Sequence, residues 1–108
     1  MTKGYLGEFE LMVLLAILHL EDDAWGLAVA QEIERRTDRE VARGSLYVTF
    51  DRLEQKGYLR SKYGDASDER GGRPRRYLAI TARGRDAVLR SRAALQGLFR
   101  GLDARLGK

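Results

Sequence analysis

The sequence predicts a small, mainly α-helical protein with one β-hairpin. Apolar residues recur at helical spacing through the first half of the chain, as at Leu46, Phe50 and Leu53. After Gly57 the pattern changes to the alternation of strands, and after Thr81 helical spacing returns. With 108 residues, 44% of them hydrophobic and 33% charged, the chain has the size and composition of one folded domain.

Two helices are expected in the first third of the chain. Residues 7–20 are apolar on nearly every side between positions 11 and 18, so this helix must be buried, within the domain or partly against a second copy. The second helix is amphipathic and covers about residues 26–37. Just before it stands Trp25, the only tryptophan, for which packing beneath the first helix is favoured over stacking against a ligand.

A third helix follows a short polar link. Its buried face is expected to carry Leu46, Phe50 and Leu53, while Ser45 is expected to cap its start and Gly57 to end it. The remaining faces carry hydroxyl, methyl-bearing and cationic side chains, a mixture that suits phosphates, thymine methyls and base edges. These candidate DNA-binding residues are Ser45, Tyr47, Val48, Thr49, Arg52 and Lys56.

The hairpin is expected to pair residues 58–63 with residues 77–80. The segment between them, residues 64–76, is too long for a tight turn and contains a glycine pair, which indicates an extended loop tip. Four arginines surround that pair: Arg70, Arg73, Arg75 and Arg76. Crowded like charges repel unless something negative neutralises them, so a polyanionic partner is favoured over a merely solvated surface.

The charge is distributed unevenly along the chain. Residues 1–54 carry a net charge of −5 and residues 55–108 a net charge of +9, for a total of +4. Most basic residues of the second half are arginines, whose planar guanidinium suits phosphate oxygens and guanine edges. The basic half therefore indicates nucleic acid as the partner.

Thr81 is expected to cap a single final helix of about 25 residues, near 37 Å long. Its apolar stripe comprises Val88, Leu95, Leu98, Phe99, Leu102 and Leu106. The far end would be exposed in a monomer, so the stripe, with Leu11 and Leu15, is expected to be buried in a homodimer rather than only against its own domain. Gly97 and Gly101 indicate either a close approach of two backbones or fraying, and the sequence does not decide between them.

Several other classes of protein are not expected. The chain has no cysteine and only one histidine, His19, so neither a disulfide framework nor a metal site is predicted. The longest apolar run, residues 11–18, is too short to span a bilayer, which predicts a cytoplasmic protein. The acidic clusters near residues 21–23 and 65–69 lack a nucleophile or a phosphate-binding motif, so neither an enzyme nor a cofactor is expected.

Three helices followed by a two-stranded hairpin make a winged helix-turn-helix. In this chain one long C-terminal dimerisation helix is expected after the hairpin. In this fold the third helix enters the major groove of DNA and the hairpin, the wing, contacts neighbouring phosphates. Residues 1–81 are therefore expected to bind double-stranded DNA and residues 82–108 to form the dimer. A winged-helix module that binds another protein is the alternative.

Two runs of residues resemble the PadR-like transcriptional regulators. GSLYVTFDRLEQKGYL, residues 44–59, is similar to the family's recognition helix, and RGGRPRRYLAITARG, residues 70–84, to its wing. The resemblance covers almost the whole chain and implies a homodimeric repressor, released from a palindromic operator by a small molecule or a stress signal. It points to DNA contacts at Tyr47, Thr49, Arg73, Arg75 and Arg76. Leu27 stands where many relatives have an aromatic residue, and the chain resembles a short member with one C-terminal helix.

Two further expectations concern aromatic groups. Phe50 and Tyr77 are expected in the core, while for Tyr47 a core position and a surface position remain equally open. If the dimer leaves an apolar gap between the first and last helices, a flat aromatic effector is expected to enter it.

Overall fold

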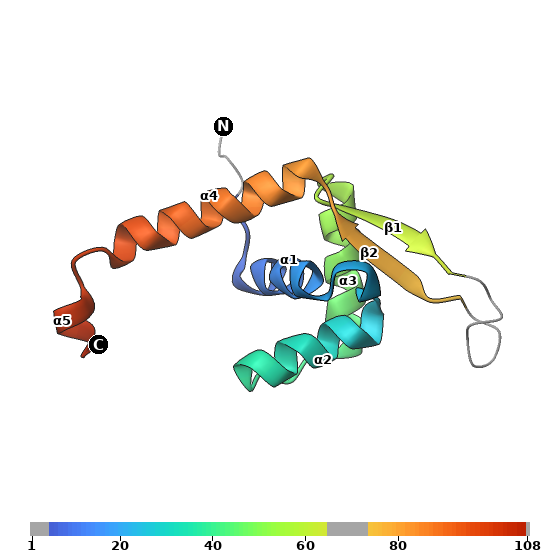
Figure 1. The fold of residues 1–108 in the computed structure, drawn as a ribbon, viewed down its shortest axis with the longest axis horizontal. Coiled ribbons are helices and arrows are strands. Elements are labelled where there is room, and N and C mark those ends of the chain that lie inside the picture. The colour runs from blue at the N-terminus through green and yellow to red at the C-terminus, as the bar shows by residue number, and fades with distance from the viewer. Residues whose placement is uncertain (1–4, 65–73, 108) are drawn as a thin grey trace.

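The computed structural model describes residues 5–64 and 74–107, and it confirms the predicted fold class (Figure 1). Three helices precede a two-stranded hairpin, and a long helix follows it. The elements are α1 (Glu8–Leu20), the 3-10 turn η1 (Glu21–Asp23), α2 (Gly26–Thr37), α3 (Arg43–Gln55), β1 (Leu59–Tyr63), β2 (Arg76–Ile80), α4 (Ala82–Phe99) and α5 (Asp103–Leu106). The predicted positions Arg70 and Arg73 lie outside the described residues.

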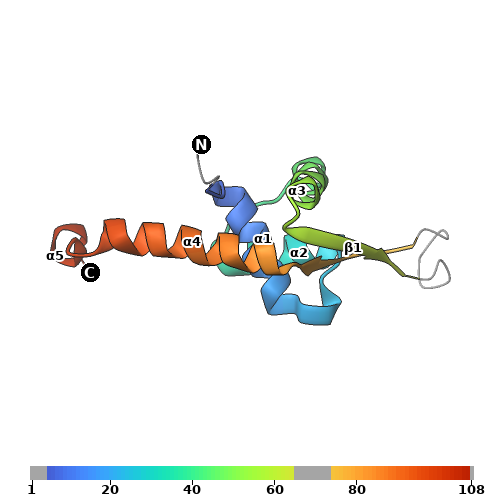
Figure 2. The ribbon, with the colours of Figure 1, turned by 90° about the horizontal axis from the view of Figure 1, so that it is seen from above.

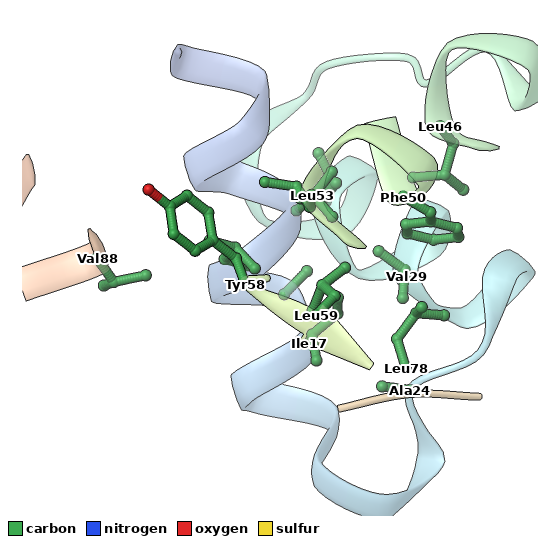
Figure 3. Packing of buried hydrophobic residues seen from close by; sticks show 14 of the residues in the cluster. Ile17, Ala24, Val29, Leu46, Phe50, Leu53, Tyr58, Leu59, Leu78 and Val88 are labelled. Atoms are coloured by element: carbon green, nitrogen blue, oxygen red, sulfur yellow. The ribbon is translucent and has the colours of Figure 1, made fainter. Parts of the chain in front are cut away.

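A single hydrophobic core joins the helices to the base of the hairpin (Figure 3). The largest fully buried side chains are Val13, Leu14, Val29, Leu46, Phe50 and Leu53. Leu59 of β1 and Leu78 of β2 are buried in the same cluster, as are Ala87 and Val88 of α4. The three core positions predicted for α3 are confirmed, and the core holds the hairpin next to that helix.

The two ends of α3 differ in how well the sequence predicted them. At its end, Gly57 has a φ of 80°, the Gly57 amide donates to Glu54, and the Tyr58 amide donates to Leu53. This is the Schellman arrangement that a glycine just beyond a helix permits. At its start, the expected cap at Ser45 is wrong, because the helix already begins at Arg43, after Ala42. The Leu46 amide donates to the Ala42 carbonyl, which adds a turn before Ser45.

The hairpin is antiparallel and is extended by the loop before α2. Its register pairs Leu59 with Ile80 at the base and Tyr63 with Arg76 at the outer end. On the other edge of β2, Trp25 forms an isolated bridge with Tyr77, and the Leu78 amide donates to Ala24 at 2.8 Å. Trp25 thus lies beside β2 and not beneath α1, which corrects the packing expected from the sequence.

The start of α4 is fixed to the end of α3. The Thr81 hydroxyl accepts from the Gly84 amide at 3.0 Å, which confirms the predicted cap, and donates to the Gly57 carbonyl at 2.6 Å. A Cβ on Gly84 would lie 2.3 Å from the Tyr58 carbonyl oxygen, so glycine allows the helix to approach this backbone closely.

The second half of α4 extends away from the rest of the molecule (Figures 1 and 2). The helix ends at Phe99, and Gly101 follows with a φ of 86°, a left-handed conformation that favours glycine. The expectation of one continuous helix of about 25 residues is therefore wrong, since the chain turns at Gly101 before α5. Val88 also differs from its expected role, because it is buried in the core of its own chain.

Candidate nucleic-acid interface

The exposed side of α3 carries most of the predicted DNA-binding residues. Ser45, Val48 and Arg52 are exposed and share one face at helical spacing, with Val48 56% exposed. Thr49 is instead buried, and its hydroxyl donates to the Ser45 carbonyl at 2.8 Å. The helix therefore presents a hydroxyl, an aliphatic group and a guanidinium to solvent, whereas Thr49 is unavailable for DNA.

Tyr47, for which the sequence left a core position and a surface position open, lies partly in each. Its ring packs edge-on against Phe50, with centroids 5.5 Å apart, and yet the residue is 39% exposed. A Cβ built on Gly26 would lie 2.2 Å from the Tyr47 hydroxyl oxygen. The tyrosine thus lies over the first turn of α2, and the absence of a side chain at Gly26 makes room for it.

Arg75 stacks on Trp25 at the edge of the hairpin. The guanidinium carbon lies 4.0 Å from the centre of the Trp25 ring, within the range of a cation–π interaction. Both side chains are half-buried, and the ring limits the positions that the guanidinium can take. This pair could not be predicted from the sequence, because the two residues lie fifty positions apart and belong to no common motif.

Arg76, also expected to contact DNA, points instead toward α3. Its side chain is only 14% exposed, and its Nη1 lies 3.0 Å from Asp51 Oδ1. Its Nη2 donates to Glu54 Oε1 at 2.6 Å and its Nε to Ser61 Oγ at 2.9 Å. Two carboxylates and a hydroxyl therefore occupy this guanidinium, which corrects its assignment as a phosphate contact.

Glu54 is held from both sides of this cluster. Its Oε1 accepts from the Ser61 hydroxyl at 2.9 Å and its Oε2 from the Ser61 amide at 3.2 Å. Burial by itself would raise the pKa of Glu54, but the hydrogen bonds from Ser61 and Arg76 outweigh it and lower that pKa below its usual value. The carboxylate thus remains charged at neutral pH.

Lys56, the last predicted position on α3, pairs with α1. Its Nζ donates to Glu10 Oε2 at 2.8 Å, while the other Glu10 oxygen accepts from the Gly7 amide at 2.9 Å. Burial would raise the pKa of Glu10, yet the hydrogen bonds from Lys56 and Gly7 lower it overall. Lys56 remains exposed enough to face DNA, although the partner on α1 offsets part of its charge.

Tyr63 is a candidate contact that sequence reasoning missed. It pairs with Arg76 at the outer end of the hairpin and is 61% exposed. Residues opposite one another in an antiparallel pair lie on the same face of the sheet, so Tyr63 shares the face that Arg76 and Ser61 turn toward α3. The alternation of residues 59–63 was the signal that could have placed it there.

Two other kinds of site find no support in the part of the chain that the structure describes. Within residues 5–64 and 74–107, no group of histidine and acidic residues could hold a metal ion. Among the same residues, none of the helices is both long and apolar enough to cross a membrane.

The fold and the exposed face of α3 together define a winged helix-turn-helix domain with a helical arm. The chain belongs to the PadR-like family of transcriptional regulators, whose family model matches residues 14–90. It is therefore a transcriptional regulator and not an enzyme, and DNA binding follows from the family.

Several individual proteins are similar to this chain. An uncharacterized protein, protein X of Lysinibacillus sphaericus, is 38% identical over 81 residues, which are 73% of this chain and 70% of the relative. A PadR family transcription regulator from Clostridium difficile is 20% identical and shares the fold, with a TM-score of 0.72 over 91% of this chain and 98% of the other. A PadR family transcriptional regulator from Eggerthella lenta is 27% identical, with a TM-score of 0.67 over 88% and 80% of the two chains.

Proposed function

We propose that this regulator is a homodimeric repressor that binds a palindromic operator through α3 and the hairpin. The observation that carries the proposal is the position of the two elements: the bonds from Arg76 to Asp51 and Glu54 place the hairpin directly beside α3. A helix in the major groove and a neighbouring wing on the phosphates require this arrangement. Val48 and Arg52 are then the base-reading candidates, and Arg75 is the phosphate contact.

Duplex binding in a salt series tests this proposal. The probe is a duplex selected from a random pool, with a scrambled duplex of equal length as the control. We expect the selected duplex to bind more tightly and the logarithm of the affinity to fall linearly with the logarithm of the salt concentration. Equal affinity for both duplexes, or an affinity independent of salt, would contradict specific DNA binding.

Arg52 offers a matched comparison for the assigned interface. Arg52→Gln should weaken binding to the selected duplex by about 1–3 kcal/mol, the range for one base contact. Arg105→Gln removes the same charge from α5, at the opposite end of the molecule from the hairpin (Figure 1). Equal losses from the two variants would show that α3 is not the reading helix. Repression itself is measured with a reporter gene placed behind the selected duplex.

The homodimer is proposed from the apolar surface at the end of α4. Exposed members of the predicted stripe are Leu95, Leu98, Phe99, Leu102 and Leu106, with Leu15 exposed on α1. Leu98 is 74% exposed, although burying such a side chain is worth about 1.5–3 kcal/mol. The first turns of α4 belong to the core, so residues 82–108 do not fold separately from residues 1–81. The proposed division at residues 81 and 82 is one between DNA binding and dimerisation.

Sedimentation of two variants tests the dimer. Leu98→Glu places a charge in the proposed interface and should give a monomer that binds the palindrome much more weakly. Gln96→Glu adds the same charge to the same helix at another exposed position. If Leu98→Glu remained dimeric, the second half of α4 would not form the interface.

An aromatic effector is proposed from a groove between α1 and α4. The groove has a volume of about 280 Å³ and is lined by Tyr5, Leu6, Glu8, Leu11, Ser91, Ala94 and Leu95. An apolar groove with few polar groups suits a flat aromatic compound. Thermal shifts against a panel of such compounds should show stabilisation, and a stabilising compound should release the duplex. A panel without any effect would count against this effector class.

A further inference from the structure

We propose that Arg76 is a positioning residue, which together with Glu54 and Ser61 fixes the hairpin at the angle to α3 that DNA recognition needs. These three residues are called the α3–hairpin bridge below. The inference rests on the proposed DNA-binding function and deepens it, because it says which contacts set the geometry of the reading surface. It replaces the role of phosphate contact expected for Arg76 from the sequence.

The bridge lies at the outer limit of the hydrophobic core. The core holds the base and the middle of the hairpin, where Leu59 and Leu78 are each 3% exposed and Leu78 pairs with Ser61. Toward the other end the hairpin extends beyond the helices, and Tyr63 is largely exposed (Figures 1 and 2). Arg76 pairs with Tyr63 at this outer end and reaches back to α3. A bond far from the base resists rotation of the hairpin better than further contacts at the base.

The bonds of the bridge are directional and mutually dependent. The Ser61 hydroxyl accepts from Arg76 Nε and donates to Glu54 Oε1, while Arg76 Nη2 donates to the same Glu54 oxygen. The Ser61 amide donates to the second Glu54 oxygen. Because a guanidinium is planar and rigid, it satisfies these acceptors in only one relative orientation of α3 and the two strands.

The charge of this cluster argues against a direct role in binding phosphate. Arg76 contributes one positive charge, whereas Glu54 and Asp51 contribute two negative charges within ion-pair distance of it. The sum is negative, on the side of α3 that faces the hairpin, and it repels a phosphate backbone. The value of the cluster for DNA recognition therefore lies in the geometry that it imposes.

Glu54→Gln distinguishes a phosphate contact from a positioning residue at Arg76, because the two roles predict opposite changes in DNA affinity. If charge alone mattered, removing a carboxylate near the DNA would release Arg76 and tighten binding. If the bridge sets the wing angle, Glu54→Gln should weaken binding to the selected duplex by about tenfold or more, the value of one base contact. Binding to the scrambled duplex should stay the same or tighten. Tighter binding to both duplexes would overturn the inference.

Two further variants separate the geometry from charge and from stability. Arg76→Lys keeps the charge but not the planar group, so it should lose selectivity as Glu54→Gln does, whereas a phosphate contact would largely survive. Glu40→Gln removes a carboxylate from the exposed loop before α3 and should not reduce selectivity. All affinities are measured well below the melting temperature of each variant, as determined by circular dichroism, so that unfolding does not contribute.

Spin labels measure the wing angle without DNA. The chain contains no cysteine, so labels can be attached at Gly44→Cys on α3 and Lys62→Cys on β1 alone. A Cβ on Gly44 meets no other atom within 4 Å, and Lys62 is exposed. The distance distribution, recorded after dilution with unlabelled protein, should broaden in Glu54→Gln and stay narrow in Glu40→Gln.

The two measurements fail independently. If the parent protein selected no duplex, the proposed function would be wrong, and the label distances would still decide whether the bridge orients the hairpin. If the parent protein were selective but Glu54→Gln left both the selectivity and the label distances unchanged, the bridge would be wrong and the DNA-binding function would stand.

Discussion

Gly26→Ala should impair DNA binding while leaving the fold almost as stable as before. The added Cβ would lie 2.2 Å from the hydroxyl oxygen of Tyr47 and 2.9 Å from the ring carbon that bears it. No side chain tolerates such distances, so one of the two groups must move. Tyr47 is the end of a partly exposed side chain, and it can turn into solvent without displacing the backbone of α2.

The expected change in stability is the sum of two opposing effects. Replacing glycine by alanine at a position whose backbone conformation alanine can adopt stabilises a protein by about 0.4–1 kcal/mol, and Gly26 begins α2. The displaced Tyr47 loses its edge-on contact with Phe50, which is worth about 0.5–1.5 kcal/mol. The free energy of unfolding should therefore change by less than about 1 kcal/mol. If Tyr47 also donates a hydrogen bond to a phosphate, its displacement should weaken duplex binding by about 1.5–3 kcal/mol.

A double-mutant cycle with Tyr47→Ala measures the coupling. Urea unfolding and duplex affinity are recorded for the parent protein, each single variant and the pair. Without the tyrosine, Gly26→Ala should stabilise the protein by about 0.4–1 kcal/mol and should leave duplex affinity unchanged. Gly44→Ala, at a helical glycine with open space, is the control and should stabilise the protein in both backgrounds. If Gly26→Ala had the same effect with and without Tyr47, the assigned overlap would be wrong.

Three further predictions concern α1, α4 and the hairpin edge. Folding lowers the pKa of Glu10, so the unfolded chain binds protons first as the pH falls. The charged Glu10 carboxylate therefore adds to the free energy of unfolding above the ordinary pKa of a glutamate, about 4.3, and this contribution is lost as the pH drops through the lower pKa of the folded state. Urea unfolding of Glu10→Gln should therefore depend less on pH in that acidic range than unfolding of the parent, and identical profiles would contradict this. Gly84→Ala should destabilise the protein by about 1–3 kcal/mol, because its Cβ would meet the Tyr58 carbonyl oxygen, and a neutral result in the same assay would refute the close contact. Duplex binding should change the fluorescence of Trp25, the only tryptophan, because its ring stacks on Arg75; unchanged emission at saturation would exclude Arg75 from the interface.

The parts of the fold that the sequence predicted depend on local patterns. Leu46, Phe50 and Leu53 recur at helical spacing, and all three are fully buried. Gly57 and Thr81 end and begin helices through hydrogen bonds to residues a few positions away. Such signals need only the neighbouring sequence, so they can be identified without a structure.

The misassignments arose where distant residues or a backbone angle decided the outcome. Arg76 is identical in type to the arginines around it, and only the fold brings Glu54 and Asp51 to it from α3. Trp25 pairs with Tyr77 of β2, which lies 52 positions further along the chain. The apolar spacing of α4 continues through Leu102, although the backbone leaves the helical conformation at Arg100, whose ψ is 127°, and turns at Gly101. Periodicity records which face is apolar and does not record whether the helix is continuous.

Two sets of residues on α3 differ in what they contact. Asp51 and Glu54 bond to Arg76 of the hairpin, whereas Val48 and Arg52 are exposed and take no part in these bonds. A substitution at Val48 or Arg52 leaves the scaffold intact, because neither side chain belongs to the bonds that support the wing. In the proposed interface, new promoter targets can therefore be reached at these two positions, one change at a time, while the bonds between the hairpin and α3 stay in place.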